Sequence, residues 1–256
     1  MPWITRGLRH GVVTTRWPAR DDAYQGSWRG VVDAIPEDVP TAERGAIEAL
    51  CPTSAISADD EGLRLDRGRC ILCGYCVNLR PDLFAWSLGA ATAVASRTTL
   101  VVPARPETNE AIDATRDELA ARTKMLRRSV HVRHVDAGSD GSEEWEILAL
   151  LNPVYDIHRL GIFFTASPRH ADILLVTGVG GTGMLAPLAR TLEAMPTPTV
   201  VVAAGTDAIS GGLVHPTYAT SGGIGGALQV DVWVPGSPPS PFSLLHGLLL
   251  AVGRLT

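Results

Sequence analysis

Four cysteines are the residues of this chain whose type and spacing most directly predict chemistry. They lie within a 26-residue segment of the 256-residue chain, which has no other cysteine. Two disulfides would use all four, but the start of the sequence lacks the apolar run of a secretory signal, and thiols in the cytosol stay reduced. Grouped cysteines in such a chain favour a metal or cluster site, with these ligands: Cys51, Cys70, Cys73 and Cys76.

The spacing of these cysteines predicts one [4Fe–4S] cluster. Cys70–Cys76 has the pattern C-x2-C-x2-C, and Cys51 is followed by Pro52. In bacterial-type iron–sulfur runs of the form C-x2-C-x2-C-x3-C-P, the fourth cysteine ligates the other cluster of a pair. Cys51 then ends a first run and joins the three later cysteines, with Gly74 allowing the tight backbone wrap. A zinc site with four thiolates is the alternative.

The second cluster of such a pair has no ligands in this sequence. The positions that would carry its cysteines hold other residues: Thr41, Arg44, Ile47 and Arg80. One complete ligand set is therefore present, and the other complete set is absent. The expected role of the remaining cluster is one-electron transfer, and a purely structural cluster is the alternative.

The elements that must position these ligands divide the chain into four parts. They are a basic arm over 1–30, a ferredoxin-like single-cluster domain over 31–84, a connector over 85–128 and a larger unit over 129–256. Strands are expected over 99–102, 129–135, 173–177, 199–203 and 230–234, and helices over 107–128, 143–151, 184–195 and 241–255. The alternation predicts an α/β fold, with a flavodoxin-like parallel sheet covered by helices on both faces. Functional residues of such sheets gather beyond the carboxyl ends of the strands.

Charge and hydropathy limit the classes of partner. The formal net charge of −5 argues against nucleic acid as the main partner, because phosphate binding needs a dense basic surface. No apolar run reaches the ~20 residues of a membrane span. The arm over 1–30 combines five arginines with scattered apolar residues. It is expected either to pack on its own protein or to lie along a membrane-embedded partner or the lipid surface.

Two parts of the chain resemble known subunits. Residues 1–84, with the arm motif Arg6–Pro18, resemble the ferredoxin-like subunit of formate hydrogenlyase and respiratory complex I. Residues 129–256 are similar to the small, proximal-cluster subunit of complex I and of group 4 membrane-bound [NiFe] hydrogenases, in the stretches Asp136–Ser139, Glu144–Asp156, Ala166–Gly178, Ala208–Gly212 and Val234–Pro241. The resemblance implies a fusion of two neighbouring subunits. It also implies a large hydrogenase- or complex I-type subunit and membrane-arm subunits as partners, with the chain cytoplasmic and peripheral on the inner face of the cell membrane.

The resemblance breaks at the proximal cluster. The positions of the four cysteines that bind it in the family hold oxygen-bearing residues here: Asp140, Glu143, Asp207 and Ser237. Carboxylates and hydroxyls are poor ligands for iron–sulfur clusters, so we expect no proximal cluster in this chain. The vacated pocket is expected to be a solvated or arginine-paired acidic patch, or else a divalent-cation site. Glu146 matches a glutamate that the family associates with proton movement, and its alternative role is electrostatic support of a helix end.

Two functions are consistent with these residues and this resemblance. In the first, the chain is an electron-transfer subunit of a membrane-associated complex and is not catalytic alone. In the second, it is a redox-inactive structural or assembly subunit of a complex that translocates ions or protons without hydrogenase chemistry. The glycine-rich run Gly178–Gly183 lies where a phosphate loop would lie, but it lacks a Walker lysine and the G-x-G-x-x-G spacing.

Overall fold

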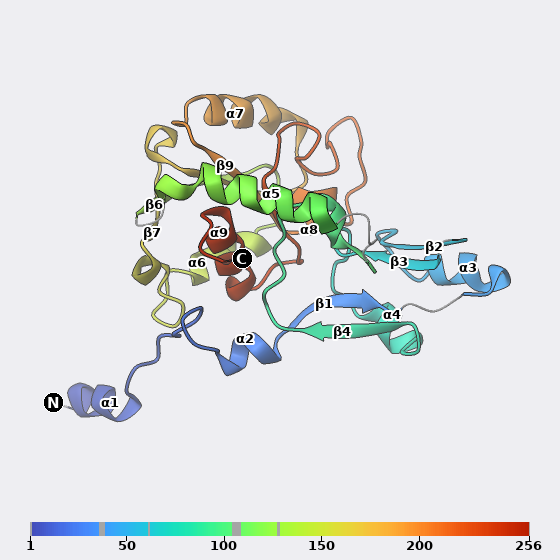
Figure 1. Cartoon of the computed structure of the whole chain (residues 1–256), viewed down its shortest axis with the longest axis horizontal. Helices are drawn as coiled ribbons and strands as arrows, with labels where there is room; N and C mark the ends of the chain where they lie inside the picture. The colour runs from blue at the N-terminus through green and yellow to red at the C-terminus, as the bar shows by residue number, and fades with distance from the viewer. Residues whose placement is uncertain (1, 36–38, 61, 104–108, 127–128, 256) are drawn as a thin grey trace.

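The larger part of the chain forms a five-stranded parallel sheet in the computed structural model, which describes residues 2–35, 39–60, 62–103, 109–126 and 129–255 (Figure 1). All neighbouring strands of this sheet run parallel. The strands are Val130–Asp136 (β6), Ile162–Phe164 (β7), Ile173–Thr177 (β8), Val200–Ala204 (β9) and Val232–Val234 (β10). Their spatial order is β10-β9-β8-β6-β7. This is the flavodoxin-like order, so the predicted α/β fold class is confirmed.

Helices cover both faces of this sheet. One face packs against α5, α6 and α9, and the opposite face packs against α7 and α8. The helices are Asn109–Arg122 (α5), Ser142–Ala149 (α6), Thr182–Glu193 (α7), Thr206–Ser210 (α8) and Pro241–Ala251 (α9), with short 3-10 turns over Ile157–Leu160 (η4) and Pro168–His170 (η5). Every residue of β8 and β9 is buried. Burial on both faces explains why these strands are continuous apolar runs in the sequence.

Some boundaries differ from the expectation. The edge strand β7 was not predicted, because three residues are too few for a periodic pattern. Within the described residues, the helix expected over 107–128 is α5 followed by a 3-10 turn over Lys124–Leu126 (η3). The last helix ends at Ala251, two residues before Gly253, whose φ of +63° lies in the left-handed region. A glycine in that conformation is a common helix terminator.

The cysteines belong to a second, smaller unit built from two antiparallel sheets. Its strands are Arg29–Ala34 (β1), Ile56–Asp59 (β2), Gly62–Asp66 (β3), Phe84–Leu88 (β4) and Val101–Val102 (β5). β1 pairs with β4, and β3 lies between β2 and β5. The helices are Thr41–Glu48 (α3), which was not expected, and Tyr75–Leu79 (α4). A strand was predicted over 99–102. The structure has a 3-10 turn over Arg97–Leu100 (η1) followed by β5, which pairs with β3. Part of the expected connector therefore adds a strand to the cysteine-bearing unit.

Segments of the N-terminal half pack directly on the parallel-sheet unit. Val94 forms an antiparallel bridge with Trp233 in the edge strand β10, through hydrogen bonds of 2.9 and 2.8 Å. Trp17 is buried, and its ring lies edge-on to Phe242 with centroids 6.0 Å apart. The backbone N–H of Thr15 donates to the carbonyl of residue 154 at 2.8 Å. These contacts join the two units into one body.

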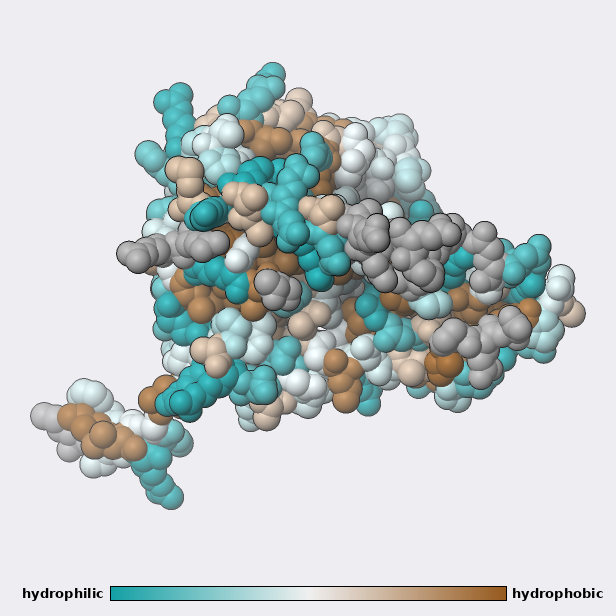
Figure 2. Space-filling view, viewed as in Figure 1, coloured by the Kyte–Doolittle hydropathy of each residue, from teal (hydrophilic) through white to brown (hydrophobic). Residues whose placement is uncertain are grey.

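The first helix, α1 (Pro2–His10), extends away from that body (Figure 1). None of its residues is buried. Trp3 and Leu8 are 72% and 79% exposed, and Figure 2 shows hydrophobic side chains open to solvent on this helix. The arm therefore packs on its own protein around Trp17 and, after α2 (Ala23–Ser27), leads into β1. Every residue of α1 is exposed. Among the described residues, no helix combines the length and apolarity needed to cross a bilayer.

Candidate metal centre and the acidic cluster

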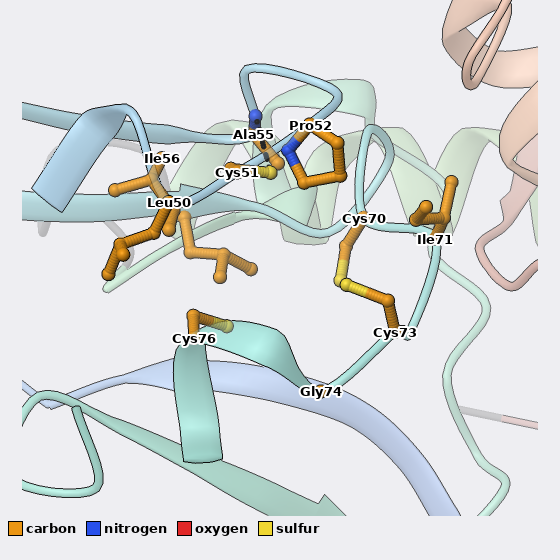
Figure 3. A pocket seen from close by; sticks show the side chains of 11 residues that line it. Leu50, Cys51, Pro52, Ala55, Ile56, Cys70, Ile71, Cys73, Gly74 and Cys76 are labelled. Atoms are coloured by element: carbon orange, nitrogen blue, oxygen red, sulfur yellow. Dashed lines mark hydrogen bonds between the residues drawn. The ribbon is translucent and has the colours of Figure 1, made fainter. Parts of the chain in front are cut away.

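Three segments of the smaller unit bring the four predicted ligands to one pocket (Figure 3). Cys51 follows α3, Cys70 and Cys73 lie in the loop after β3, and Cys76 lies in the first turn of α4. Figure 3 shows the sulfur atoms of Cys70 and Cys73 turned toward each other, with Cys76 facing them across the pocket. The rest of the wall is mostly apolar: Leu50, Pro52, Ala55, Ile56, Leu65 and Ile71.

All four cysteines are free thiols, and their exposure differs. Cys70 and Cys76 are buried, Cys51 is half-buried and Cys73 is exposed. Burial raises the pKa of Cys70 to about 12, with smaller contributions from the charges of the other three cysteines. Burial also raises the pKa of Cys76. Because thiols bind metals as thiolates, metal binding at this pocket would require these cysteines to lose their protons.

A backbone amide of the pocket wall hydrogen-bonds to one of the sulfur atoms. The N–H of Ala55 donates to Cys51 Sγ at 3.2 Å. The backbone at Leu72 and Val77 acts to lower the pKa of Cys70 and Cys76 respectively, against the larger effect of burial. Hydrogen bonds to thiolates and an apolar surrounding are features by which proteins tune iron–sulfur clusters. The donor set therefore fits a cluster held by four thiolates.

Gly74 meets the backbone requirement that was predicted for it. Its φ of +71° is in the left-handed region, and a Cβ here would lie 3.0 Å from the Trp86 ring. A side chain at this position would therefore disturb the turn into α4.

Within the described ranges, no three or more His, Cys, Asp or Glu side chains meet around a point that could hold a single metal ion. The thiols line a pocket instead of converging on one position.

Three acidic residues at the predicted vacated positions lie beyond the carboxyl ends of the large sheet's strands. Asp140 and Glu143 follow β6, and Asp207 follows β9. Glu143 is only 1% exposed, and its Oε2 accepts a hydrogen bond from Ser142 Oγ at 3.1 Å. This is the region where the strand order reverses between β6 and β8, and sheets of this type bind ligands at such a point.

The carboxyl groups of these three residues, the acidic cluster, influence one another. Burial raises the pKa of Glu143 to about 7, and the charges of Asp207 and Asp140 raise it as well. Burial raises the pKa of Asp207, again with a contribution from Asp140. Asp140 is exposed, and hydrogen bonds from Ser142 lower its pKa. The three residues are therefore close enough to interact, and the buried member holds a proton most readily.

The fourth vacated position, Ser237, lines a separate cleft between the two units. The cleft has a volume of about 520 Å³ and is also lined by Glu146 and the exposed Cys73. Its wall on the smaller unit includes Trp86, with the guanidinium of Arg29 5.7 Å from the centre of the ring. The structure therefore brings Ser237 and Glu146 to the open side of the cysteine site.

Glu146 lies in the second turn of α6. The acidic residues in the first turn of that helix are Glu143 and Glu144, so they hold the positions that interact favourably with the helix N-terminus. Burial raises the pKa of Glu146. The charge of Glu146 in turn contributes to a raised pKa of Tyr155. A carboxyl with a raised pKa on a cleft is able to donate a proton there.

A chain of hydrogen-bonded side chains near the acidic cluster was not predicted from the sequence. Thr177 Oγ1 donates to Glu144 Oε1 at 2.5 Å, and Ser139 Oγ donates to the other oxygen of Glu144 at 2.6 Å. His134 Nε2 lies 3.0 Å from Thr177 Oγ1. Because the threonine proton is already donated, this nitrogen carries the imidazole proton. The signal available in the sequence was the position of Thr177 at the end of an apolar strand.

Close backbone packing accounts for the glycine-rich run that resembles a phosphate loop. A Cβ on Gly180 would lie 2.2 Å from Ser221 Oγ. The Ser221 hydroxyl and backbone N–H both donate to the Gly180 carbonyl at 2.9 Å. Two glycine-rich segments are thus held against each other, which is a structural reason for glycine at this position.

A family model and several curated proteins match this chain. The family described as NADH ubiquinone oxidoreductase, 20 kDa subunit, matches residues 141–251. Formate hydrogenlyase subunit 7 of Escherichia coli (strain K12) is 40% identical over 136 residues, which are 53% of this chain and 53% of that protein. The chain thus spans about half the length of that relative.

Two further relatives extend this comparison. The probable membrane-bound hydrogenase subunit mbhJ of Pyrococcus furiosus is 39% identical over 137 residues, which cover 54% of this chain and 82% of that protein. An NADH-quinone oxidoreductase subunit of Citrifermentans bemidjiense is 46% identical over 104 residues, which cover 41% of this chain and 61% of that protein. These matches show that the chain belongs to the family of the 20 kDa subunit of NADH ubiquinone oxidoreductase.

Proposed function

We propose that the chain is an iron–sulfur subunit of a membrane-associated complex related to complex I and group 4 hydrogenases. In this proposal it carries electrons through one [4Fe–4S] cluster and docks a large, catalytic-type subunit. The names of the relatives support membership of such complexes: one is a formate hydrogenlyase subunit, one a probable membrane-bound hydrogenase subunit and one a quinone oxidoreductase subunit.

The observation that carries the proposal is that four free thiols line one mostly apolar pocket. Cys51, Cys70, Cys73 and Cys76 would hold the cluster, which supplies one-electron transfer when bound. The protein contributes the apolar wall and the hydrogen bond from the Ala55 N–H to Cys51 Sγ. Cys73, the exposed ligand, lies on the cleft between the two units, so that cleft is the side on which the site is open.

The chain is further proposed to be a fusion that has lost the proximal cluster. A ferredoxin-like unit over 31–84 precedes the unit related to the 20 kDa subunit, and carboxylates and a hydroxyl occupy the vacated positions Asp140, Glu143, Asp207 and Ser237. Hard oxygen donors disfavour an iron–sulfur cluster there. Glu146, on the cleft and with a raised pKa, is proposed to exchange protons at the open side of the cysteine site.

Metal content and magnetic resonance test the cluster directly. The anaerobically purified chain is expected to contain about four irons and no zinc, and dithionite reduction is expected to give the EPR signal of one isolated cluster. Cys73→Ser should lower the iron content, whereas Ser27→Ala, at an exposed hydroxyl bonded within its own helix, should leave it unchanged. Zinc in place of iron, or a signal from two interacting clusters, would contradict the proposal.

A second function is favoured by the loss of the proximal ligands. Without a proximal cluster, electrons have no next iron–sulfur site in this chain, so it is alternatively a redox-inactive structural subunit of an ion- or proton-translocating complex. The purified complex decides between the two. Nickel in the large partner subunit and reoxidation of the cluster by that partner support electron transfer. A nickel-free partner and a cluster that no other subunit oxidises or reduces support the structural function.

Association with the membrane is proposed to be peripheral and to occur on the inner face of the membrane. The exposed apolar residues of α1 lie beside Arg6 and Arg9, a combination suited to a lipid surface or a membrane-arm subunit. Nucleic acid is not proposed as a partner, because the net charge is −5.

A further inference from the structure

Three consecutive carbonyls lead into the cysteine loop, and a hydroxyl donates a hydrogen bond to each of them. The donor–acceptor pairs are Ser210 Oγ to Gly68 O at 2.9 Å, Thr53 Oγ1 to Arg69 O at 2.6 Å and Thr206 Oγ1 to Cys70 O at 2.9 Å. Buried carbonyls need partners, and backbone partners are the usual ones. Here each carbonyl from Gly68 to Cys70 is instead held by a side-chain hydroxyl.

Two of these donors come from α8 of the parallel-sheet unit. Thr206 and Ser210 are four residues apart and therefore lie on the same side of the helix. Thr206 is fully buried. A Cβ on Gly68 would lie 2.7 Å from Ile209 Cγ2, so the loop backbone lies directly on α8. The unit that lacks cysteines thus contacts the backbone of a cluster ligand.

The hydrogen bond to Cys70 bears on the geometry of the sulfur site. Its carbonyl belongs to a planar peptide, so fixing the oxygen also fixes the direction of the following amide. Two residues further on, Leu72 has a left-handed φ of +56°, an uncommon conformation for a residue with a side chain, and Cys73 follows it directly. Movement of the Cys70 carbonyl would therefore shift the backbone between Cys70 and Cys73, whose side chains both line the pocket.

We propose that Thr206 and Ser210 are positioning residues for the cluster. Through them, α8 holds the cysteine loop and sets the reduction potential and the lability of a cluster that the helix does not ligate. Loss of the hydroxyls frees the loop backbone to move, which changes the hydrogen bonding and solvent exposure of the sulfur atoms, and both set the potential of an iron–sulfur cluster. This inference rests on the proposed cluster at the four cysteines.

The test compares Thr206→Val, Ser210→Ala and the double variant with the wild-type holoprotein. Thr206→Val keeps the shape of the side chain and removes only the donor, and Thr206→Ser restores a hydroxyl. Thr191→Val is the matched control, because Thr191 donates to the carbonyl of Pro187 far from the cysteines. The readouts are the midpoint potential from an EPR-monitored titration, the EPR line shape and the rate of iron release to a chelator.

The double variant is expected to have a shifted midpoint potential and an altered EPR line shape. Each lost hydroxyl should speed iron release by about tenfold. Thr206→Ser and Thr191→Val should match the wild type. If Thr206→Val does not fold, the milder Ser210→Ala variant carries the same test. Wild-type potential and iron release in Ser210→Ala and the double variant would overturn the inference alone, whereas an iron-free wild-type chain would overturn the proposed function as well.

Discussion

Replacing Glu143 with glutamine tests whether the carboxyl group of Glu143 holds a proton near neutral pH. Burial and the neighbouring carboxylates raise the pKa of Glu143 from 4.5 to about 7. The folded state therefore binds this proton more tightly than the unfolded state, and the associated stability is lost as the pH rises from 4.5 to 7. At 1.36 kcal/mol for each pKa unit, ionised Glu143 costs about 3 kcal/mol above pH 7.

Glutamine removes this cost, because it has the same shape, carries no charge and can still accept from Ser142. Glu143→Gln should raise the free energy of unfolding by about 3 kcal/mol at pH 8 and by about 1 kcal/mol at pH 5. The assay is urea denaturation followed by circular dichroism, under anaerobic conditions and at matched cluster content. Glu193→Gln, at an exposed helical position, is the control and should change neither value. An equal gain at both pH values, or no gain at pH 8, would refute the reasoning.

Three further predictions concern other parts of the chain. Burial lowers the pKa of His246 to about 4, so stability should fall by about 2 kcal/mol between pH 7 and pH 5, and His246→Asn should remove that fall in denaturation curves. Trp17→Ala should cost about 3–5 kcal/mol of unfolding free energy, whereas Trp28→Ala, at a 52% exposed side chain, should cost far less. Replacing Trp3 and Leu8 together with serine should weaken binding to anionic phospholipid vesicles by about tenfold or more in a sedimentation assay.

The strands of the large sheet were predictable because burial on both faces leaves a plain sequence signal. In β8 every residue is buried, so the strand is an uninterrupted apolar run. β7 was missed because it is short and lies at the edge, with Phe163 36% exposed. Its place in the sheet depends on pairing with β6, which no local pattern shows.

The candidate site was predictable only in part. Cysteine spacing predicts that the four thiols gather, and they line one pocket; cluster ligation by them stays a prediction. The hydroxyls that hold the loop could not be found, because Thr206 and Cys70 are 136 residues apart in the chain. Likewise, the sequence places acidic residues at three vacated positions, but the raised pKa of Glu143 depends on burial against Gly205.

The bridge between Val94 and Trp233 has a consequence for how the two units could be separated. An outer strand such as β10 offers unpaired backbone groups along its free side, and natural sheets protect such edges from pairing with other molecules. Here a segment leading out of the cysteine-bearing unit occupies part of that edge. The N-terminal half thereby shields its companion from self-association. Production of the parallel-sheet unit alone would expose the Trp233 backbone and favour aggregation, which gives a physical reason for keeping both units in one polypeptide.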